Sequence, residues 1–134
     1  MRAVDYLQSL EFVDPERIGM TGHSYGGVGT IFAAAFDPRI KVAVASGPVA
    51  VSSPGFSRLI ALVAPRPLLV GQAIGDHRPA DEAGYAAARQ LYAALGAKDR
   101  DKFVWQAGDR DYPPELRRAA VDWFRHWFNA PLPE

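Results

Sequence analysis

The sequence predicts an α/β fold, in which helices cover both faces of a parallel sheet of about four strands in a three-layer αβα arrangement. Short apolar segments alternate with longer segments of helical periodicity, a pattern typical of parallel sheets. The segment IKVAVAS is apolar almost throughout, as in a strand that is buried on both faces. A hydrophobic content of 49% is sufficient for a buried core, and we expect residues 1–134 to form a single domain.

The first half of the chain is expected to contain two strands. Apolar residues at positions 3, 4, 7 and 10 have helical spacing, and Asp14-Pro15 ends that helix. A short apolar strand follows in ERIGMTG, and YGGVGTIFAAAFD is expected to be the next helix. IKVAVAS is the second strand, and a region rich in Gly, Pro and Ser then leads to a short helix at FSRLIALVA.

The second half repeats the alternation. RPLLVGQAIGD predicts a third strand that ends in a polar loop, and DKFVWQAG predicts a fourth. Between them, DEAGYAAARQLYAALGA has the acidic start and the late glycine that favour a helix. ELRRAAVDWFRHWF predicts a final amphipathic helix, whose apolar stripe contains Leu116, Ala120, Trp123 and Trp127.

Charge and composition exclude several classes of function. Fifteen basic and fifteen acidic side chains give no net charge, so no broad field would attract nucleic acid or a membrane surface. The chain has no cysteine, and its longest apolar runs are far too short to cross a bilayer. Asp5 and Glu11 interrupt the apolar stretch that a signal peptide would need, so the cytoplasm is the default expectation. We expect no cofactor.

The segment TGHSYGG presents a candidate nucleophile. Gly22, Ser24 and Gly26 satisfy the pattern G-x-S-x-G, in which a sharp turn between a strand and a helix exposes the serine. We expect both glycines to be required for lack of space, and the backbone N–H of Tyr25 to be one oxyanion donor. The stretch lacks the lysine of a phosphate loop, and the third glycine of a dinucleotide fingerprint would fall on Phe32.

The residues around this motif resemble the α/β-hydrolase superfamily, and the resemblance covers nearly the whole chain. VDPERIGMTGHSYGG looks like the nucleophile region, and APRPLLVGQAIGD and YPPELRRAAVDWF are similar to later segments of esterases of the dienelactone-hydrolase and acetyl-xylan-esterase kind. The resemblance implies a serine nucleophile, then an acid, then a histidine. Ser24 matches the first role and Asp76 the second. In GDRDYP, Arg110 stands where the resemblance implies the histidine.

Arginine stays protonated and cannot accept the serine proton, so the three histidines are the candidate bases. His23 adjoins the nucleophile, where a packing role is expected. His126 lies on the polar side of the last helix, where a solvated surface role is expected. His77 follows Asp76 in the same loop and is the possible substitute base, with an ordinary loop residue as the alternative.

Other residues near the motif have two interpretations each. Asp76 is interpreted as the triad acid, and a helix-capping role is the alternative. Tyr25, Trp105 and Tyr112 are candidates for an acyl pocket, or for aromatic residues of the core or rim. A metal site at Asp76, His77 and the acids that follow has no recognised ligand spacing, so we expect none.

The resemblance covers only the C-terminal half of the superfamily's fold, a partial fold that lacks the N-terminal strands and the loop that supplies the second oxyanion donor. The resemblance also implies that the four strands lie side by side in sequence order. The first strand would then be an uncovered edge that favours self-association or a partner carrying the missing strands. Three classes of function follow: a serine ester hydrolase impaired at Arg110, a degenerate hydrolase that serves as a binding module, and a truncation product. A prolyl-peptidase-like serine hydrolase fragment is a further alternative, because those relatives share the motif.

Overall fold

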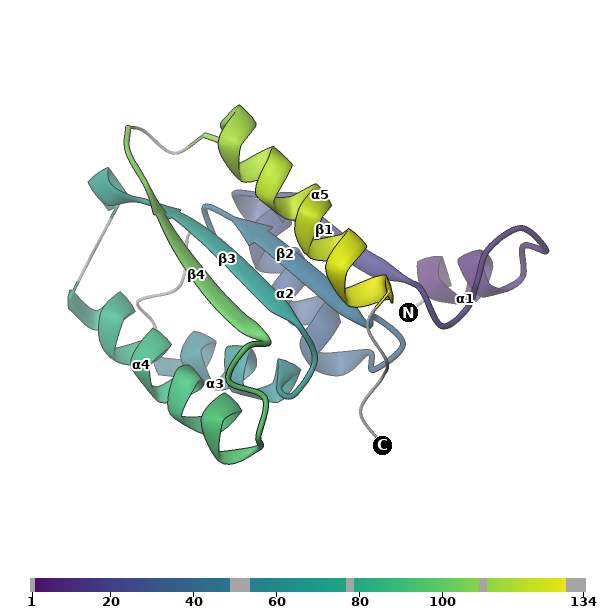
Figure 1. The fold of residues 1–134 in the computed structure, drawn as a ribbon, viewed down its shortest axis with the longest axis horizontal. Coiled ribbons are helices and arrows are strands. Elements are labelled where there is room, and N and C mark those ends of the chain that lie inside the picture. Colours follow the sequence, from purple (N-terminus) through teal and green to yellow (C-terminus); the bar gives the residue numbers. More distant parts are fainter. Residues whose placement is uncertain (1, 49–53, 77–78, 109–110, 130–134) are drawn as a thin grey trace.

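A four-stranded parallel sheet with helices on both faces forms the molecule, as the sequence predicts (Figure 1). The computed structural model describes residues 2–48, 54–76, 79–108 and 111–129. The strands follow one another across the sheet in the order β1-β2-β3-β4. The elements are α1 (Arg2–Gln8), β1 (Gly19–His23), α2 (Tyr25–Phe36), β2 (Val42–Ser46), α3 (Pro54–Val63), β3 (Leu68–Ala73), the 3₁₀ helix η1 (Ile74–Asp76), α4 (Pro79–Ala94), β4 (Asp101–Gln106) and α5 (Pro114–Asn129).

The two inner strands form the buried centre of the sheet. Every residue of β2 and β3 is buried, as their continuous apolar sequences predict. The outer strands β1 and β4 are only partly buried. All neighbouring strands pair in parallel, so their carboxyl ends lie at the same end of the sheet. The segments that follow β1, β2, β3 and β4 therefore begin at this end of the sheet, where ligands bind in open α/β sheets.

Each face of the sheet has its own hydrophobic core. Helices α2, α3 and α4 cover one face, where Ile31, Ile60 and Tyr92 are fully buried (Figure 1). Helix α5 covers the other face through the stripe that the sequence predicts, with Leu116, Ala120 and Trp127 buried and Trp123 half-buried. Sequence patterning thus identified the inner side of α5 correctly.

A charged network at the amino ends of the strands holds α1 and the α2–β2 connection together. The Arg39 guanidinium donates to both carboxylate oxygens of Asp37 at 2.8 Å, and also to Asp5 and Gln8. Asp37 is 4% exposed, and the hydrogen bonds from Arg39 hold its pKa well below the usual range of a carboxyl group. This network lies at the opposite end of the strands from Ser24.

No helix in the described parts of the chain is long and apolar enough to cross a membrane.

Candidate active site

Ser24 occupies the turn between β1 and α2. Its backbone angles, φ 54° and ψ −116°, make it the non-glycine residue with positive φ within the described ranges. Such angles cost about 1–3 kcal/mol and are typical of a nucleophile presented on a sharp strand-to-helix turn. A serine that precedes a helix usually caps it, yet the Ser24 side chain makes no capping hydrogen bond. The hydroxyl is therefore not engaged by the helix that it introduces.

Two close backbone approaches explain the glycines of this turn. A Cβ atom at Gly22 would overlap the carbonyl oxygen of Gly26. A Cβ atom at Gly27 would lie 2.6 Å from the carbonyl oxygen of Ser46 on β2. At Gly26 a Cβ atom would meet nothing within 4 Å, so the expectation that Gly26 is required for lack of space is wrong. The steric constraint falls on Gly22 and Gly27, because these residues face the neighbouring backbone.

His23 is a packing and hydrogen-bonding neighbour, as expected. Its Nδ1 lies 3.0 Å from Ser46 Oγ on the paired strand, and its ring stacks on Tyr112 with 6.1 Å between centroids. The Tyr112 hydroxyl lies 3.3 Å from Thr21 Oγ1, so this aromatic residue joins the loop after β4 to strand β1. Tyr112 therefore belongs to the rim of the site.

Buried polar side chains hold the loop between β4 and α5 in place. Gln106, which ends β4 and is 9% exposed, donates from Nε2 to the carbonyl oxygen of Asp111 at 2.8 Å. Ser46 Oγ is 3.4 Å from the same oxygen. Sequence reasoning did not identify Gln106 or Ser46 as site residues, although each is a polar residue at the carboxyl end of a predicted strand. Together they tie Asp111 to β4 and to β2, the strand beside Ser24.

The structure also locates other predicted site residues. Tyr25 is the first residue of α2, so its backbone N–H lies at the amino end of the helix as the oxyanion role requires, while its side chain is 83% exposed. Trp105 packs edge-on against Tyr85 on the α4 side of the sheet, which supports the interpretation as a core aromatic. His126 is exposed on α5, as expected.

The predicted acid of the site, Asp76, follows β3 at the same end of the sheet as Ser24. Asp76 ends η1, directly after β3 and at the carboxyl end of the strands. His77 and Arg110 lie outside the described residues. Within the described ranges, Ser24 makes backbone hydrogen bonds with Ser46 and Val28, and no histidine, aspartate or glutamate bonds to its hydroxyl. The same part of the chain holds no group of three or more potential metal-ligating residues.

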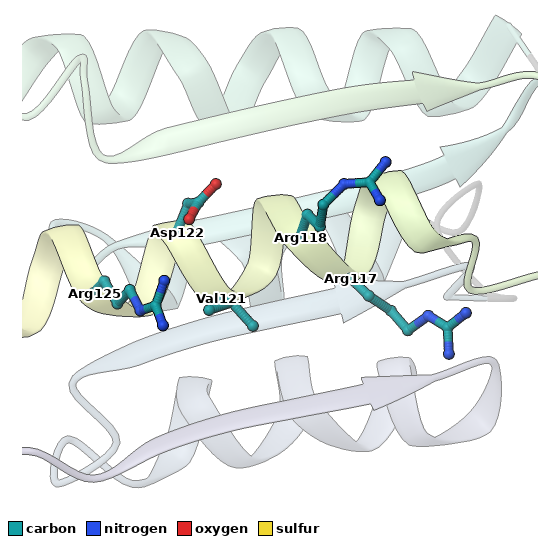
Figure 2. A pocket seen from close by; sticks show the side chains of 5 residues that line it. All are labelled: Arg117, Arg118, Val121, Asp122 and Arg125. Atoms are coloured by element: carbon teal, nitrogen blue, oxygen red, sulfur yellow. The ribbon is translucent and has the colours of Figure 1, made fainter.

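Two surface hollows involve α5, and neither is lined by Ser24. One, of about 380 Å³, lies between the end of β4 and the start of α5, and Gln106, Leu116 and Glu115 contribute to its lining. The other, of about 360 Å³, is formed by side chains of α5 alone. Figure 2 shows Arg117, Arg118 and Arg125 spread along this helix with Val121 and Asp122 between them. Side chains of a single helix enclose little, so the second hollow is not a substrate site.

Comparisons with known proteins find relatives in sequence and in structure. A sequence profile of the prolyl oligopeptidase family matches residues 1–53. A Bacillus subtilis protein named "Putative hydrolase YtaP" is 29% identical over 153 aligned positions, which cover 95% of this chain. Among solved structures, the methylesterase BT1017 superposes on 96% of this chain with a TM-score of 0.82 and 27% identity. The chain belongs to the α/β-hydrolase superfamily.

More distant α/β-hydrolase structures share the fold. A glucuronoyl esterase from Sporotrichum thermophile has a TM-score of 0.81 at 19% identity and covers 99% of this chain. The chain spans 51% of the Bacillus subtilis relative, 34% of the methylesterase and 51% of the Sporotrichum enzyme. It therefore spans between about a third and about half of the length of these relatives.

Proposed function

We propose that this α/β-hydrolase chain carries the nucleophile of a serine hydrolase that acts on carboxylic esters. The observation that carries the proposal is the backbone of Ser24, which is held at φ 54° between β1 and α2 with its hydroxyl unused by the helix cap. A strained conformation of this kind persists where the surrounding structure imposes it, and it is common at catalytic nucleophiles.

The reaction would proceed by acyl transfer. Ser24 Oγ would attack the ester carbonyl carbon and lose its proton to a base, and the backbone N–H of Tyr25 would donate to the developing oxyanion. Collapse of the tetrahedral intermediate would release the alcohol, and attack by water would then free the acid and restore the serine. Asp76 is the proposed acid of the site, on the grounds of its position after β3.

We further propose that the isolated chain is impaired in this reaction. Position 110 is arginine, which cannot accept a proton near neutral pH. His77, in the loop after η1, is the candidate substitute base. The second oxyanion donor is expected from a segment equivalent to the part of the relatives that this chain does not cover.

Hydrolysis of p-nitrophenyl acetate tests the proposal. We expect turnover close to the rate in buffer alone, together with slow acetylation of Ser24 that intact-mass and peptide analysis detect, because the missing base is needed for both acylation and deacylation. Ser24→Ala should lose this one acetyl group and keep any background modification of lysine. Rapid turnover that depends on Ser24 would contradict the proposed impairment, and equal acetylation of both proteins would contradict the assignment of the nucleophile.

A degenerate hydrolase that serves as a binding module is the second candidate. The observation that favours it is Arg110, because a guanidinium can hold a carboxylate through two parallel hydrogen bonds. The match of residues 1–53 to the prolyl oligopeptidase family also keeps peptides among the candidate substrates.

A further inference from the structure

The hollow between the end of β4 and the start of α5 has the size and the walls of a small-molecule site. Its volume of about 380 Å³ lies within the range of known ligand pockets. Val104, Leu116 and Ala119 give it apolar walls, and Leu116 is only 3% exposed because it packs on the sheet. Two residues of the described lining, Gln106 and Glu115, carry side-chain oxygen atoms. These oxygen atoms decide which ligand the hollow can take.

Gln106 brings a buried hydrogen-bond acceptor to this hollow. Phe103 and Trp105 pack against the core on the α4 side, so the alternation of the strand directs Gln106 to the α5 side. Gln106 Nε2 donates to the carbonyl oxygen of Asp111, which can only accept, and this bond fixes the orientation of the carboxamide. The other atom, Oε1, is buried and has no hydrogen-bond partner within the described ranges. A buried acceptor without a donor costs free energy, which an N–H group of a ligand would recover.

Glu115 adds a negative charge at the exposed side of the same hollow. Its Oε1 lies 3.2 Å from the Arg118 guanidinium in a pair whose side chains are both at least 70% exposed. An exposed pair of this kind contributes little free energy, so the carboxylate can still accept a hydrogen bond from a ligand. No lysine or arginine is among the described residues that line the hollow. Two oxygen acceptors, one of them charged, therefore favour a ligand that donates hydrogen bonds and carries a positive charge.

We propose that this hollow, here called the β4–α5 pocket, binds a primary alkylammonium group. The ammonium would donate to Gln106 Oε1 and to the Glu115 carboxylate, and its alkyl chain would lie against Leu116 and Ala119. A small alkylamine and the lysine side chain of a peptide share this chemistry. Ser24 does not line the pocket, so the proposal does not rest on the proposed hydrolase function.

Titration of the full chain with n-butylammonium chloride at pH 7 tests the proposal, with amide NMR signals as the readout. Glu115→Gln removes the charge at an exposed position, and Ala119→Phe fills the pocket from a half-buried position on α5. The matched control is Glu16→Gln, because Glu16 also forms an exposed ion pair, with Lys41, but lies before β1 at the other end of the strands. Circular dichroism confirms that each variant is folded.

We expect butylammonium to bind the wild type in the millimolar range and to shift the side-chain amide signals of Gln106. Ala119→Phe should weaken binding by at least about tenfold, and Glu115→Gln by about threefold, as for the loss of one exposed charge. Glu16→Gln should bind like the wild type. Butyltrimethylammonium, which carries the charge but no N–H, should bind at least about tenfold more weakly than butylammonium.

A lysine capped at both its amino and carboxyl groups distinguishes the two sources of the ammonium. Tighter binding of the capped lysine than of butylammonium would identify a peptide side chain as the ligand, and weaker binding would identify a free amine; both results support the pocket. Valerate that binds as tightly as butylammonium would overturn the choice of a cation. Signals that do not change with the amine, or changes that neither pocket variant reduces, would overturn the proposal. None of these readouts depends on ester hydrolysis, so their failure is distinguishable from failure of the proposed function.

Discussion

Ser24 shows at the residue scale how neighbouring groups hold a strained nucleophile in position. Its N–H donates to the carbonyl oxygen of Ser46 at 2.8 Å, and its carbonyl oxygen accepts from the N–H of Val28 at 3.1 Å. Gly22 and Gly27 allow the turn and β2 to approach within the space that a side chain would need. The unfavourable backbone angles of Ser24 are thus fixed by bonds and contacts on both of its sides.

Alanine substitutions at the two motif glycines should have opposite effects. Gly22→Ala forces a Cβ atom against the carbonyl oxygen of Gly26 and should lower the free energy of unfolding by about 1–3 kcal/mol or more. Gly26→Ala meets open space inside α2 and should be neutral or stabilising by up to about 1 kcal/mol. Urea unfolding measures both values. Equal losses at the two positions would contradict this account of the turn.

Asp37 should make stability depend on acid pH. The hydrogen bonds from Arg39 lower the pKa of Asp37 in the folded state, whereas the unfolded chain titrates near about 4. Its stabilising contribution is therefore complete above about pH 4 and is lost as the pH falls toward the folded-state pKa. Asp37→Asn should lower the thermal midpoint at pH 7 and flatten its decrease between about pH 4 and pH 2. An unchanged pH dependence in this variant would contradict the assignment.

The sequence predicts the site only in part at this scale. G-x-S-x-G identifies Ser24 because the pattern encodes a backbone turn, and the turn is local. The contacts of His23 with Ser46 and Tyr112 join residues 23 and 89 positions apart, and no local spacing encodes them. For the same reason Gly27, which faces β2, could not be distinguished from Gly26 by the motif.

Helix α5 illustrates the element scale. Its inner stripe packs on β2 and β3, and Leu116 lies over Gly71, where a Cβ atom would overlap the leucine side chain. Gly71 in β3 therefore makes room for the first turn of α5. The periodicity of the segment predicted this stripe, because an amphipathic helix that covers a sheet needs apolar residues at helical spacing.

Removal of the Leu116 side chain should weaken the attachment of α5. Leu116 is 3% exposed, so Leu116→Ala should lower the free energy of unfolding by about 2–5 kcal/mol. Leu95→Ala, at a position that is 52% exposed, is the matched control and should change it by less than about 0.5 kcal/mol. Chemical denaturation measures both. Similar values for the two variants would show that α5 is not held through Leu116.

Sequence patterns predict the elements well where they are long or fully buried. Strands β2 and β3 are buried throughout and mostly apolar, and helices α4 and α5 have clear periodicity, so the sequence predicts all four. Their order across the sheet was implied only by the superfamily resemblance, because hydrophobic patterns do not state which strands are neighbours. The outcome, β1-β2-β3-β4, agrees with it.

At the scale of the whole molecule, the α/β-hydrolase chain combines a formed nucleophile turn with a sheet in which β1 is an outer strand in the described ranges. The carboxyl ends of all four strands meet at the proposed site, while β1 has a strand partner on one side only in the described structure.

Restoration of a histidine alone should not produce an efficient esterase. Arg110→His supplies a candidate base, yet loss of one oxyanion donor commonly reduces the rate by about a hundredfold or more. We therefore expect its turnover of p-nitrophenyl acetate to stay at least about a hundredfold below that of a site with two oxyanion donors. Efficient turnover by the Arg110→His chain would contradict the proposed need for a second oxyanion donor.

The most direct test of the central claim is the rate of fluorophosphonate labelling, followed by intact mass from pH 6 to pH 10 on folded wild type and Ser24→Ala. We expect one slow adduct that is absent from Ser24→Ala. Its rate should rise with pH throughout if Arg110 leaves Ser24 without a base, because arginine cannot accept the serine proton. A rate that levels off near pH 7 would instead identify a histidine base, and His77→Ala would test whether it is that residue. No adduct on the folded wild type, or an adduct that Ser24→Ala retains, would contradict the claim that Ser24 is the nucleophile.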